Sequence, residues 1–381
     1  MCFSLSQRIM ELSNEGAEIE TMRTGFHDLD SNETYIALDP SGLRYRLRDL
    51  PRQCREAWTN CDTLELPGHW WNVKQVVIGG MGGSAIAGDL VINLAASKQS
   101  AVPIMLVRDF SLPFKLDNNY LFIACSYSGT TEETLSLFRQ AVTQDASVLT
   151  ITGGGTLARE AGTAGIPVLN INSSGEPRSA VGYNLMLLLG ALSKAAILTT
   201  ENDDVQSAVA ALEEQIACCN EDVPATENPA KLLAQELVDK FIVIYGGGPF
   251  SALARRWKTQ LNENSKAWAF FETIPELLHN SVEAFQSSFA GGNNLNVLVL
   301  RPGASGKELD VRYDAVVGLL QRENVPHRVL KAAGHSPLAQ LLSMLVLGDY
   351  VSYYLALLKG VDPSPTPVLQ MGKELLNSSG R

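Results

Sequence analysis

Glu263 and His279 are the side chains that first suggest chemistry, because they follow a segment with the pattern of a strand, a glycine turn and a helix. We expect the strand at 241–245, the turn at 246–249 and the helix at 251–261. Such a turn places backbone N–H groups at the helix start, where they bind anions. A carboxylate and an imidazole nearby suit proton transfer. The segment therefore predicts acid/base chemistry on a small phosphorylated substrate.

A second candidate site follows an expected strand at 121–125. It has a glycine surrounded by four hydroxyl side chains: Ser126, Ser128, Thr130 and Thr131. In open α/β sheets ligands bind at the carboxyl ends of strands, and hydroxyls at a helix start can hold a phosphate without a lysine. Thr130 and Glu133 also have the spacing of a capping box, which is the plainer interpretation. Because a cap needs one hydroxyl and this turn has four, we favour a phosphate site.

A third glycine-rich turn, at 79–84, follows a short apolar strand at 76–78. Residues 80–85 match part of the dinucleotide fingerprint GxGxxG/A, so a nucleotide site is an alternative to the phosphosugar site. A dinucleotide site also needs an acidic residue at the end of the second strand. Asp109 stands near that place, but it follows Arg108 and the interval is longer than usual. A turn that only lets a helix and a strand pack closely is an equally good interpretation.

Glu263, His279 and Arg178 each have a plainer interpretation as well. A Glu at a helix end is usually solvated, but Glu263 lies off the buried stripe of its helix, beside Asn262, Asn264 and Lys258. A single His is more often structural than catalytic, and Glu276 is spaced to pair with His279 on a short helix. Arg178 follows an expected strand and precedes an apolar helix, where it is either a solvated loop charge or a partner for an anionic substrate.

Length and composition indicate a globular protein of two domains. The chain has 381 residues, of which 45% are hydrophobic and 19% charged, and this length exceeds one ordinary core. The net charge of −11 argues against a nucleic-acid partner, because binding to a phosphate backbone needs a basic surface. The most apolar run, 185–192, is too short to cross a bilayer. Charged residues interrupt the N-terminal segment, so we expect neither a signal peptide nor a membrane partner.

The six cysteines are expected to be reduced thiols of a cytoplasmic protein. None belongs to a CxxC pair, and the adjacent Cys218 and Cys219 do not have the spacing of a zinc site. Since the sequence has no cluster of metal ligands, we expect no metal.

Strands and helices alternate through two related halves of the chain. Strands are expected at 76–78, 104–107, 121–125, 148–151, 167–171, 241–245, 295–300 and 325–330, and a long apolar helix at 336–359. This alternation predicts an α/β fold of parallel sheets with helices on both faces, in three α/β/α layers. The expected divisions are an N-terminal extension and helix at 1–70, a first domain at 71–216, a linker at 217–230 and a second domain at 231–381.

Several segments resemble the bifunctional phosphoglucose/phosphomannose isomerases of the sugar isomerase (SIS) superfamily. They are 79–88, 125–133, 177–184, 256–264, 275–280 and 348–365. The resemblance covers about residues 40–381, and the motifs 256–264 and 275–280 in this order look specific to that family. It implies two SIS-type domains and a homodimer whose active sites lie between the subunits.

The resemblance also implies an activity. Glucose 6-phosphate and mannose 6-phosphate would interconvert with fructose 6-phosphate through a cis-enediol(ate), without a cofactor. Glu263 matches the base that moves a proton between C1 and C2, His279 the neighbouring subunit's group that assists ring opening, and Arg178 the arginine that would stabilise enediolate charge. The other matched residues contact the substrate: Ser126, Ser128 and Thr131 at the phosphate, Gly83 and Ser84 in the first glycine turn, and the C-terminal Lys373.

The sequence departs from the family pattern at three places. Ser281 stands where an acidic residue is expected, Gly372 precedes Lys373 where an ordinary helix would avoid glycine, and the first forty residues match nothing. Two other hypotheses stay open. One is a non-catalytic SIS module that senses a phosphosugar, and the other is a dinucleotide-dependent oxidoreductase.

Overall fold

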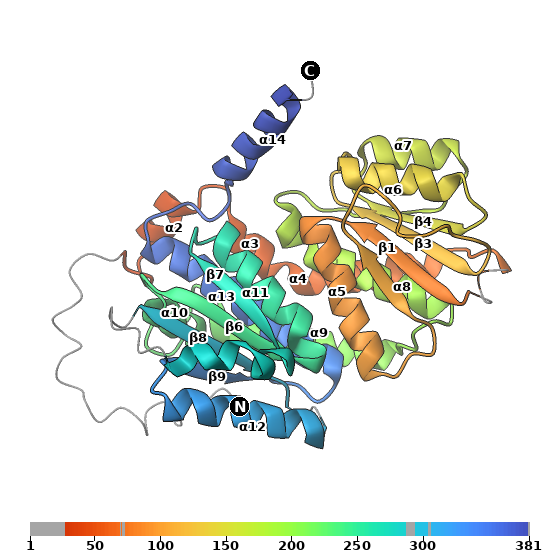
Figure 1. Ribbon diagram of the computed structural model, residues 1–381. Helices are drawn as coiled ribbons and strands as arrows, with labels where there is room; N and C mark the ends of the chain where they lie inside the picture. Colours follow the sequence, from red (N-terminus) through yellow and green to blue (C-terminus); the bar gives the residue numbers. More distant parts are fainter. Residues whose placement is uncertain (1–26, 69, 71–72, 287–293, 304–305, 380–381) are drawn as a thin grey trace, which may run out of the picture.

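Two parallel β-sheets form the framework of the protein (Figure 1). The computed structural model describes residues 27–68, 70, 73–286, 294–303 and 306–379. Within them, the first sheet has the order β2-β1-β3-β4-β5, and its strands are β1 (Gln75–Gly80), β2 (Ile104–Val107), β3 (Tyr120–Ser126), β4 (Ser147–Thr152) and β5 (Val168–Asn170). The second sheet has the order β7-β6-β8-β9, and its strands are β6 (Phe241–Gly247), β7 (Ala269–Ile274), β8 (Leu295–Arg301) and β9 (His327–Lys331). The expected parallel α/β architecture is confirmed.

The register of the first sheet places its two polar turns side by side. Gly80 at the end of β1 pairs with Cys125 in β3, and Ser126 pairs with Thr152 in β4. All of these strands run parallel, so their carboxyl ends meet at one edge of the sheet. The glycine turn after β1 and the turn with the Ser and Thr hydroxyls after β3 therefore lie at the same edge.

Helices cover both faces of each sheet, as Figure 1 shows. On the first sheet, α6 (Glu132–Val142) and α7 (Gly155–Thr163) pack on one face, and α5 (Gly82–Ser97) and α8 (Val181–Lys194) on the other. On the second sheet, α11 (Ser251–Glu263) and α13 (Pro337–Leu358) pack on one face, and α12 (Lys307–Arg322) on the other. One continuous core, which includes Ile78 of β1 and Ile244 of β6, joins the two halves.

Six further α-helices belong to the part of the chain that the structure describes. They are α2 (Asn32–Leu38), α3 (Leu43–Arg48), α4 (Leu50–Asn60), α9 (Asn202–Cys219), α10 (Pro229–Glu236) and α14 (Pro367–Ser379). The helix expected within residues 1–70 is confirmed as α4, which packs on α8. α9 lies along α13 and continues into the range expected as a linker.

α13 has the length and apolar composition of a membrane-spanning helix. However, 94% of its most apolar window is buried inside the protein, so it is the core helix of the second half. In contrast to the buried α13, α14 is exposed. It extends away from the body at the top of Figure 1 and exposes more than half of each of its large apolar side chains: Val368, Leu369, Met371, Leu375 and Leu376.

Strand β7 and helices α9 and α12 are not among the predicted elements. β7 is an edge strand whose Phe270 is half exposed and whose Phe271 is only partly buried, so it lacks the continuous apolar run that marks β1 and β6. α9 and α12 have acidic first turns and only narrow apolar stripes, so they contain no continuous apolar run from which a buried element could be predicted.

The cysteines differ in one respect from the expectation. Cys54, Cys61, Cys125 and Cys219 are buried free thiols, and burial raises the pKa of each to about 12. Cys218, in the last turn of α9, is disulfide-bonded. The prediction of reduced thiols is therefore wrong for Cys218.

Candidate active site

The turn between β3 and α6, residues 126–131, has its Ser and Thr hydroxyl groups around Gly129, and we call it the hydroxyl turn. The Ser126 hydroxyl donates to the Thr131 hydroxyl at 3.1 Å and accepts the Gly129 N–H at 3.1 Å. The Ser128 hydroxyl accepts the N–H and the hydroxyl of Thr130 at 3.2 and 3.0 Å. Thr131 is the N-cap of α6, but its side chain makes no capping hydrogen bond. The capping box of Thr130 and Glu133 is therefore not formed, and the hydroxyls lie at an uncapped helix start, where an anion would be stabilised.

Gly129 is required by packing and by backbone conformation. Its φ is +64°, and a Cβ there would lie 1.8 Å from the backbone oxygen of Gly154. No other residue fits at this contact, because a left-handed conformation and a backbone clash would both have to be relieved. The close approach fixes the hydroxyl turn against the loop after β4.

The first glycine turn is open on one side and packed on the other. Gly82 has a φ of +49° and faces open space, whereas a Cβ on Gly83 would lie 3.1 Å from the carbonyl of Pro177. α5 therefore begins in close contact with the segment that carries Arg178. The Ser84 hydroxyl accepts the Tyr127 N–H at 3.0 Å, which ties this turn to the hydroxyl turn after β3.

Arg178 is a buried guanidinium with fixed partners on the second half of the chain. It lies in the short helix Pro177–Ala180 and is 5% exposed. It donates to the Asn264 side-chain oxygen at 2.6 Å and to the carbonyls of Pro363 and Ser364 at 2.8 and 2.7 Å. Burial lowers the pKa of Arg178, and the carboxylates of Glu263 and Glu176 oppose that effect.

Glu263 is the last residue of α11 and faces Arg178. Its carboxylate oxygen lies 3.5 Å from the nearest Arg178 nitrogen, and its side chain is 31% exposed. It lines two cavities. The polar cavity, of about 240 Å³, is lined by cations and glycines that include Gly82, Gly83, Arg108, Arg178, Arg255 and Lys258. A carboxylate that can accept a proton and a guanidinium that can stabilise negative charge therefore share one cavity.

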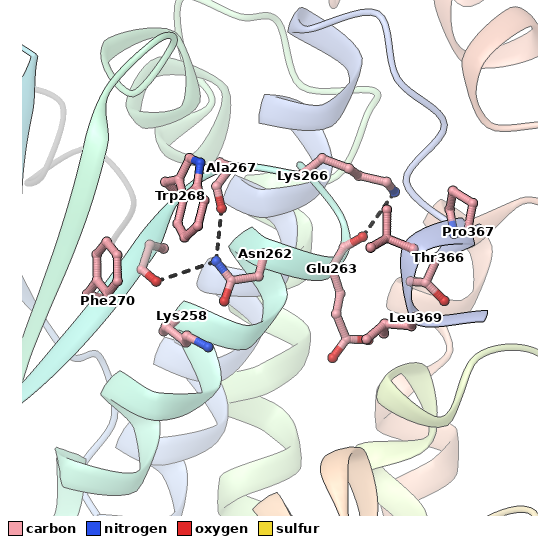
Figure 2. A pocket seen from close by; sticks show the side chains of 12 residues that line it. Lys258, Asn262, Glu263, Lys266, Ala267, Trp268, Phe270, Thr366, Pro367 and Leu369 are labelled. Carbon is pink, nitrogen blue, oxygen red and sulfur yellow. Dashed lines mark hydrogen bonds between the residues drawn. The ribbon is translucent and has the colours of Figure 1, made fainter. Parts of the chain in front are cut away.

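The apolar cavity, of about 410 Å³, lies between the end of α11, the start of β7 and the start of α14. Figure 2 shows Lys258, Asn262 and Glu263 projecting from α11 at its edge, with Trp268 and Phe270 along one wall. The two aromatic rings are stacked, with centroids 6.0 Å apart, and both are at least half exposed. Glu263 is thus reached from two sides.

The anion site expected at the turn 246–249 is not available, and that prediction is wrong. Asn93 of α5 accepts the Ala252 N–H at 2.7 Å, so a protein side chain already occupies the start of α11. The Tyr313 hydroxyl accepts the Gly247 N–H at 2.7 Å, and Phe250 is 1% exposed. The chemistry of this segment lies at the carboxyl end of α11, where Glu263 stands.

His279 and Lys373 lie outside both cavities. His279 ends the short helix Glu276–His279 after β7 and is exposed. Glu276 accepts a hydrogen bond from the Asn280 side chain at 3.2 Å, rather than forming the expected pair with His279. Lys373 is exposed on α14, which forms a helix despite Gly372. Within one chain, the polar cavity therefore brings together Arg178, Glu263 and the first glycine turn. The turn 126–131 is tied to that glycine turn through Ser84, but Ser126, Ser128 and Thr131 do not line the cavity, and neither do His279 and Lys373.

Several functional candidates were missed by sequence reasoning. Arg108 and Arg255 line the polar cavity, and both lie near Asp89, with Arg255 at 3.7 Å. Arg256 forms a buried ion pair with Asp349 at 2.8 Å and donates to the Arg178 backbone carbonyl at 3.0 Å. These residues come from separate elements, so no local spacing in the sequence indicates them. Asp109, which the dinucleotide alternative would need, does not line the polar cavity.

This combination of parallel sheets, a hydroxyl turn and an interdomain carboxylate is that of an SIS-type protein. A family model described as the bacterial phospho-glucose isomerase C-terminal SIS domain matches residues 226–376. The bifunctional phosphoglucose/phosphomannose isomerase of Caldicellulosiruptor bescii is 34% identical over 86% of this chain and 97% of its own length. That of Thermoplasma volcanium is 34% identical over 79% of this chain and 90% of its own length. The chain belongs to the bifunctional phosphoglucose/phosphomannose isomerase family.

Solved structures share the fold. A glucose-6-phosphate isomerase like protein from Thermus thermophilus matches with a TM-score of 0.60 at 21% identity, over 91% of this chain and 99% of that chain. Tagatose-6-phosphate ketose/aldose isomerase from Escherichia coli matches with a TM-score of 0.63 at 16% identity, over 85% of this chain and 95% of that chain.

Proposed function

We propose that this protein is an aldose–ketose isomerase that interconverts glucose 6-phosphate and mannose 6-phosphate with fructose 6-phosphate. The observation that carries the proposal is the 3.5 Å approach of Glu263 to Arg178 in the polar cavity, which the first glycine turn also lines. Membership of the family supports the same substrates. A non-catalytic sensor needs the phosphate turn but has no use for a base paired with a guanidinium.

Each group has a defined task in this reaction. Ser126, Ser128 and Thr131 bind the phosphate, and Gly83 and Ser84 contact the sugar. The Glu263 carboxylate accepts the proton from C2 of the aldose and returns it to C1 of the cis-enediol(ate). Arg178 stabilises the negative charge that develops on the enediolate oxygen. No cofactor takes part, since the proton returns to the same substrate molecule.

The active enzyme is a homodimer in this proposal, with His279 and Lys373 acting from positions that one chain does not complete. Two observations support it. His279 is exposed and lines neither cavity, and α14 exposes five large apolar side chains that water solvates poorly. The location is cytoplasmic, which the four buried free thiols support and cell fractionation would test.

A coupled assay with fructose 6-phosphate as substrate, in the presence of EDTA, tests the activity. Glucose 6-phosphate and mannose 6-phosphate are scored separately, and both products are expected. Glucose 6-phosphate alone would contradict the dual specificity. Binding of fructose 6-phosphate with no product would contradict catalysis and favour the sensor.

Mixing two inactive variants tests the shared site. Glu263→Ala and His279→Ala are expected to be inactive alone and to regain activity after they are mixed and allowed to exchange subunits, because some dimers then hold one complete site. Light scattering gives the oligomeric state. A monomer, or a mixture that stays inactive despite exchange, would contradict the shared site.

A further inference from the structure

Lys266 connects two segments that the proposed reaction needs to keep together. Its ammonium donates to the carbonyls of Glu263 and Asn264 at 3.0 and 3.1 Å, and to those of Asp362 and Pro363 at 2.8 and 3.3 Å. The first pair belongs to the end of α11, and the second to the connection between α13 and α14. Figure 2 shows the Lys266 side chain turned back toward the backbone oxygen of Glu263.

The backbone of Lys266 adopts an unfavourable conformation to make these contacts. Its φ is +51°, in the left-handed region that side chains other than glycine and asparagine seldom adopt. The turn directs the side chain back over its own helix, where the last carbonyls lack partners within the helix. A cation at this place also interacts favourably with the negative end of the helix dipole.

Arg178 holds the same connection from the other side. It donates to the carbonyls of Pro363 and Ser364, so Pro363 accepts from both cations. Arg178 also binds Asn264, the residue that follows Glu263. Both cations therefore bind the end of α11 and the segment 362–364. These contacts hold the Glu263 carboxylate and the Arg178 guanidinium in fixed positions relative to each other.

We propose that Lys266 is a positioning residue, which holds the end of α11 and the segment 362–364 together so that Glu263 keeps its place beside Arg178. The inference rests on the proposed isomerase function, since it concerns the geometry of that reaction. Lys266 does not touch the reacting carbons in this account. It acts through the backbone on which Glu263 stands.

The charge of Lys266 connects this role to pH. The residue as a whole is exposed, but its ammonium is partly buried among carbonyls, and this burial and the nearby Arg178 lower the pKa of Lys266 to about 8. Asp362, Glu263 and Glu176 oppose the shift, and Lys359 donates to the Lys266 backbone carbonyl. We call the four contacts between the Lys266 ammonium and the backbone carbonyls the Lys266 clamp. The clamp is therefore complete at neutral pH, and the Lys266 side chain loses its charge as the pH rises through about 8.

The effect on stability has the opposite sign. Because the folded state lowers the pKa of Lys266, the unfolded chain binds more protons between pH about 8 and the ordinary lysine value. The contribution of Lys266 to the free energy of unfolding therefore rises with pH in this window. Activity that falls while stability holds would separate positioning from a purely structural role.

Three variants test the proposal: Lys266→Met, Lys266→Arg and the control Lys98→Met. Lys98 also donates to a backbone carbonyl, that of Thr199 at 2.8 Å, but it follows the far end of α5. We expect Lys266→Met to lower kcat about tenfold at neutral pH, as a small displacement of a catalytic group does, with KM unchanged because the phosphate turn is intact. Lys266→Arg should retain activity at alkaline pH, where wild-type kcat falls. Lys98→Met should behave like wild type.

Hydrogen exchange gives a readout independent of turnover. The amides of 263–266 and 361–366 should exchange faster in Lys266→Met than in wild type. Wild-type kcat in Lys266→Met, a wild-type alkaline decline in Lys266→Arg, or unchanged exchange would each overturn the proposal. A wild-type protein that turns over no hexose phosphate would instead contradict the proposed function, and the exchange comparison would still decide whether Lys266 forms the clamp.

Discussion

The two halves of the chain contain the same local sequence of elements and use it differently. In the first half, β1 leads through Gly82 and Gly83 into α5, and this turn opens on the polar cavity. In the second half, β6 leads through Gly247 into α11, but Asn93 and the Tyr313 hydroxyl take the backbone N–H groups there. A strand, a glycine turn and a helix therefore define where an anion could bind. Distant residues decide whether the place is free.

The second half contributes through the other end of its helix. α11 begins in the closed turn and ends at Glu263, which faces the first half. In the proposed reaction, the open turn supplies substrate contacts and the closed turn anchors the helix that carries the base. This division between an open binding turn and a closed anchoring turn can be tested from both sides.

Glu263→Gln should have the largest effect. The amide keeps the shape of the side chain but cannot accept the substrate proton, so kcat should fall by about a thousandfold while KM changes little. Steady-state kinetics with fructose 6-phosphate measures this. Glu160→Gln is the control. Glu160 of α7 forms an ion pair with Arg139 of α6 at 2.6 Å on the surface and lines neither cavity. Full activity in Glu263→Gln would place the base elsewhere and remove the assigned role of α11.

Thr131→Val and Ser251→Ala compare the helix start after the hydroxyl turn of the first half with the helix start after the closed turn of the second half. Thr131 makes no capping bond, so valine should preserve α6 while removing a hydroxyl from the proposed phosphate site. A hydrogen bond to a charged group contributes about 1.5–3 kcal/mol, so KM should rise by about tenfold or more. Ser251 begins α11 behind the closed turn, and its loss should leave KM unchanged. An equal rise of KM in both variants would contradict the distinction between the turns.

Gly83→Ala and Gly247→Ala compare the turns themselves. The added methyl on Gly83 lies 3.1 Å from the Pro177 carbonyl and would displace the segment of Arg178 by a few tenths of an ångström, so kcat should fall about tenfold with little loss of stability. The methyl on Gly247 lies 2.9 Å from Ile274 in the core. Overpacking there should lower the free energy of unfolding by about 1–3 kcal/mol and leave kcat unchanged. Steady-state kinetics and urea denaturation of both variants measure these effects. A loss of stability without a loss of kcat in Gly83→Ala, and a loss of kcat without a loss of stability in Gly247→Ala, would contradict the prediction.

The sequence predicted the elements better than their environment. The strands β1, β3, β4, β6 and β8 follow from short apolar runs bounded by turn residues, and the hydroxyl turn follows from its composition. The closure of the second turn could not be predicted, because Asn93 and Tyr313 reach it from α5 and α12.

The same reason limits the prediction of the candidate site. Glu263 and Arg178 could be singled out by residue type and position, but their approach depends on the packing of the two halves. Lys266 was not singled out, because its four carbonyl contacts require a left-handed turn and a segment nearly a hundred residues away.

Tyr313→Phe should have the smallest effect and sharpens the comparison most directly. The Tyr313 hydroxyl accepts the Gly247 N–H at 2.7 Å and donates to the Leu300 carbonyl at 2.9 Å, and the side chain is fully buried. Its removal leaves a buried N–H without this partner, so the free energy of unfolding should fall by about 1–2 kcal/mol. The proposed reaction takes place at the far end of α11, so kcat and KM should not change. A fall in kcat without a fall in stability would mean that the closed turn takes part in catalysis and does not merely anchor the helix.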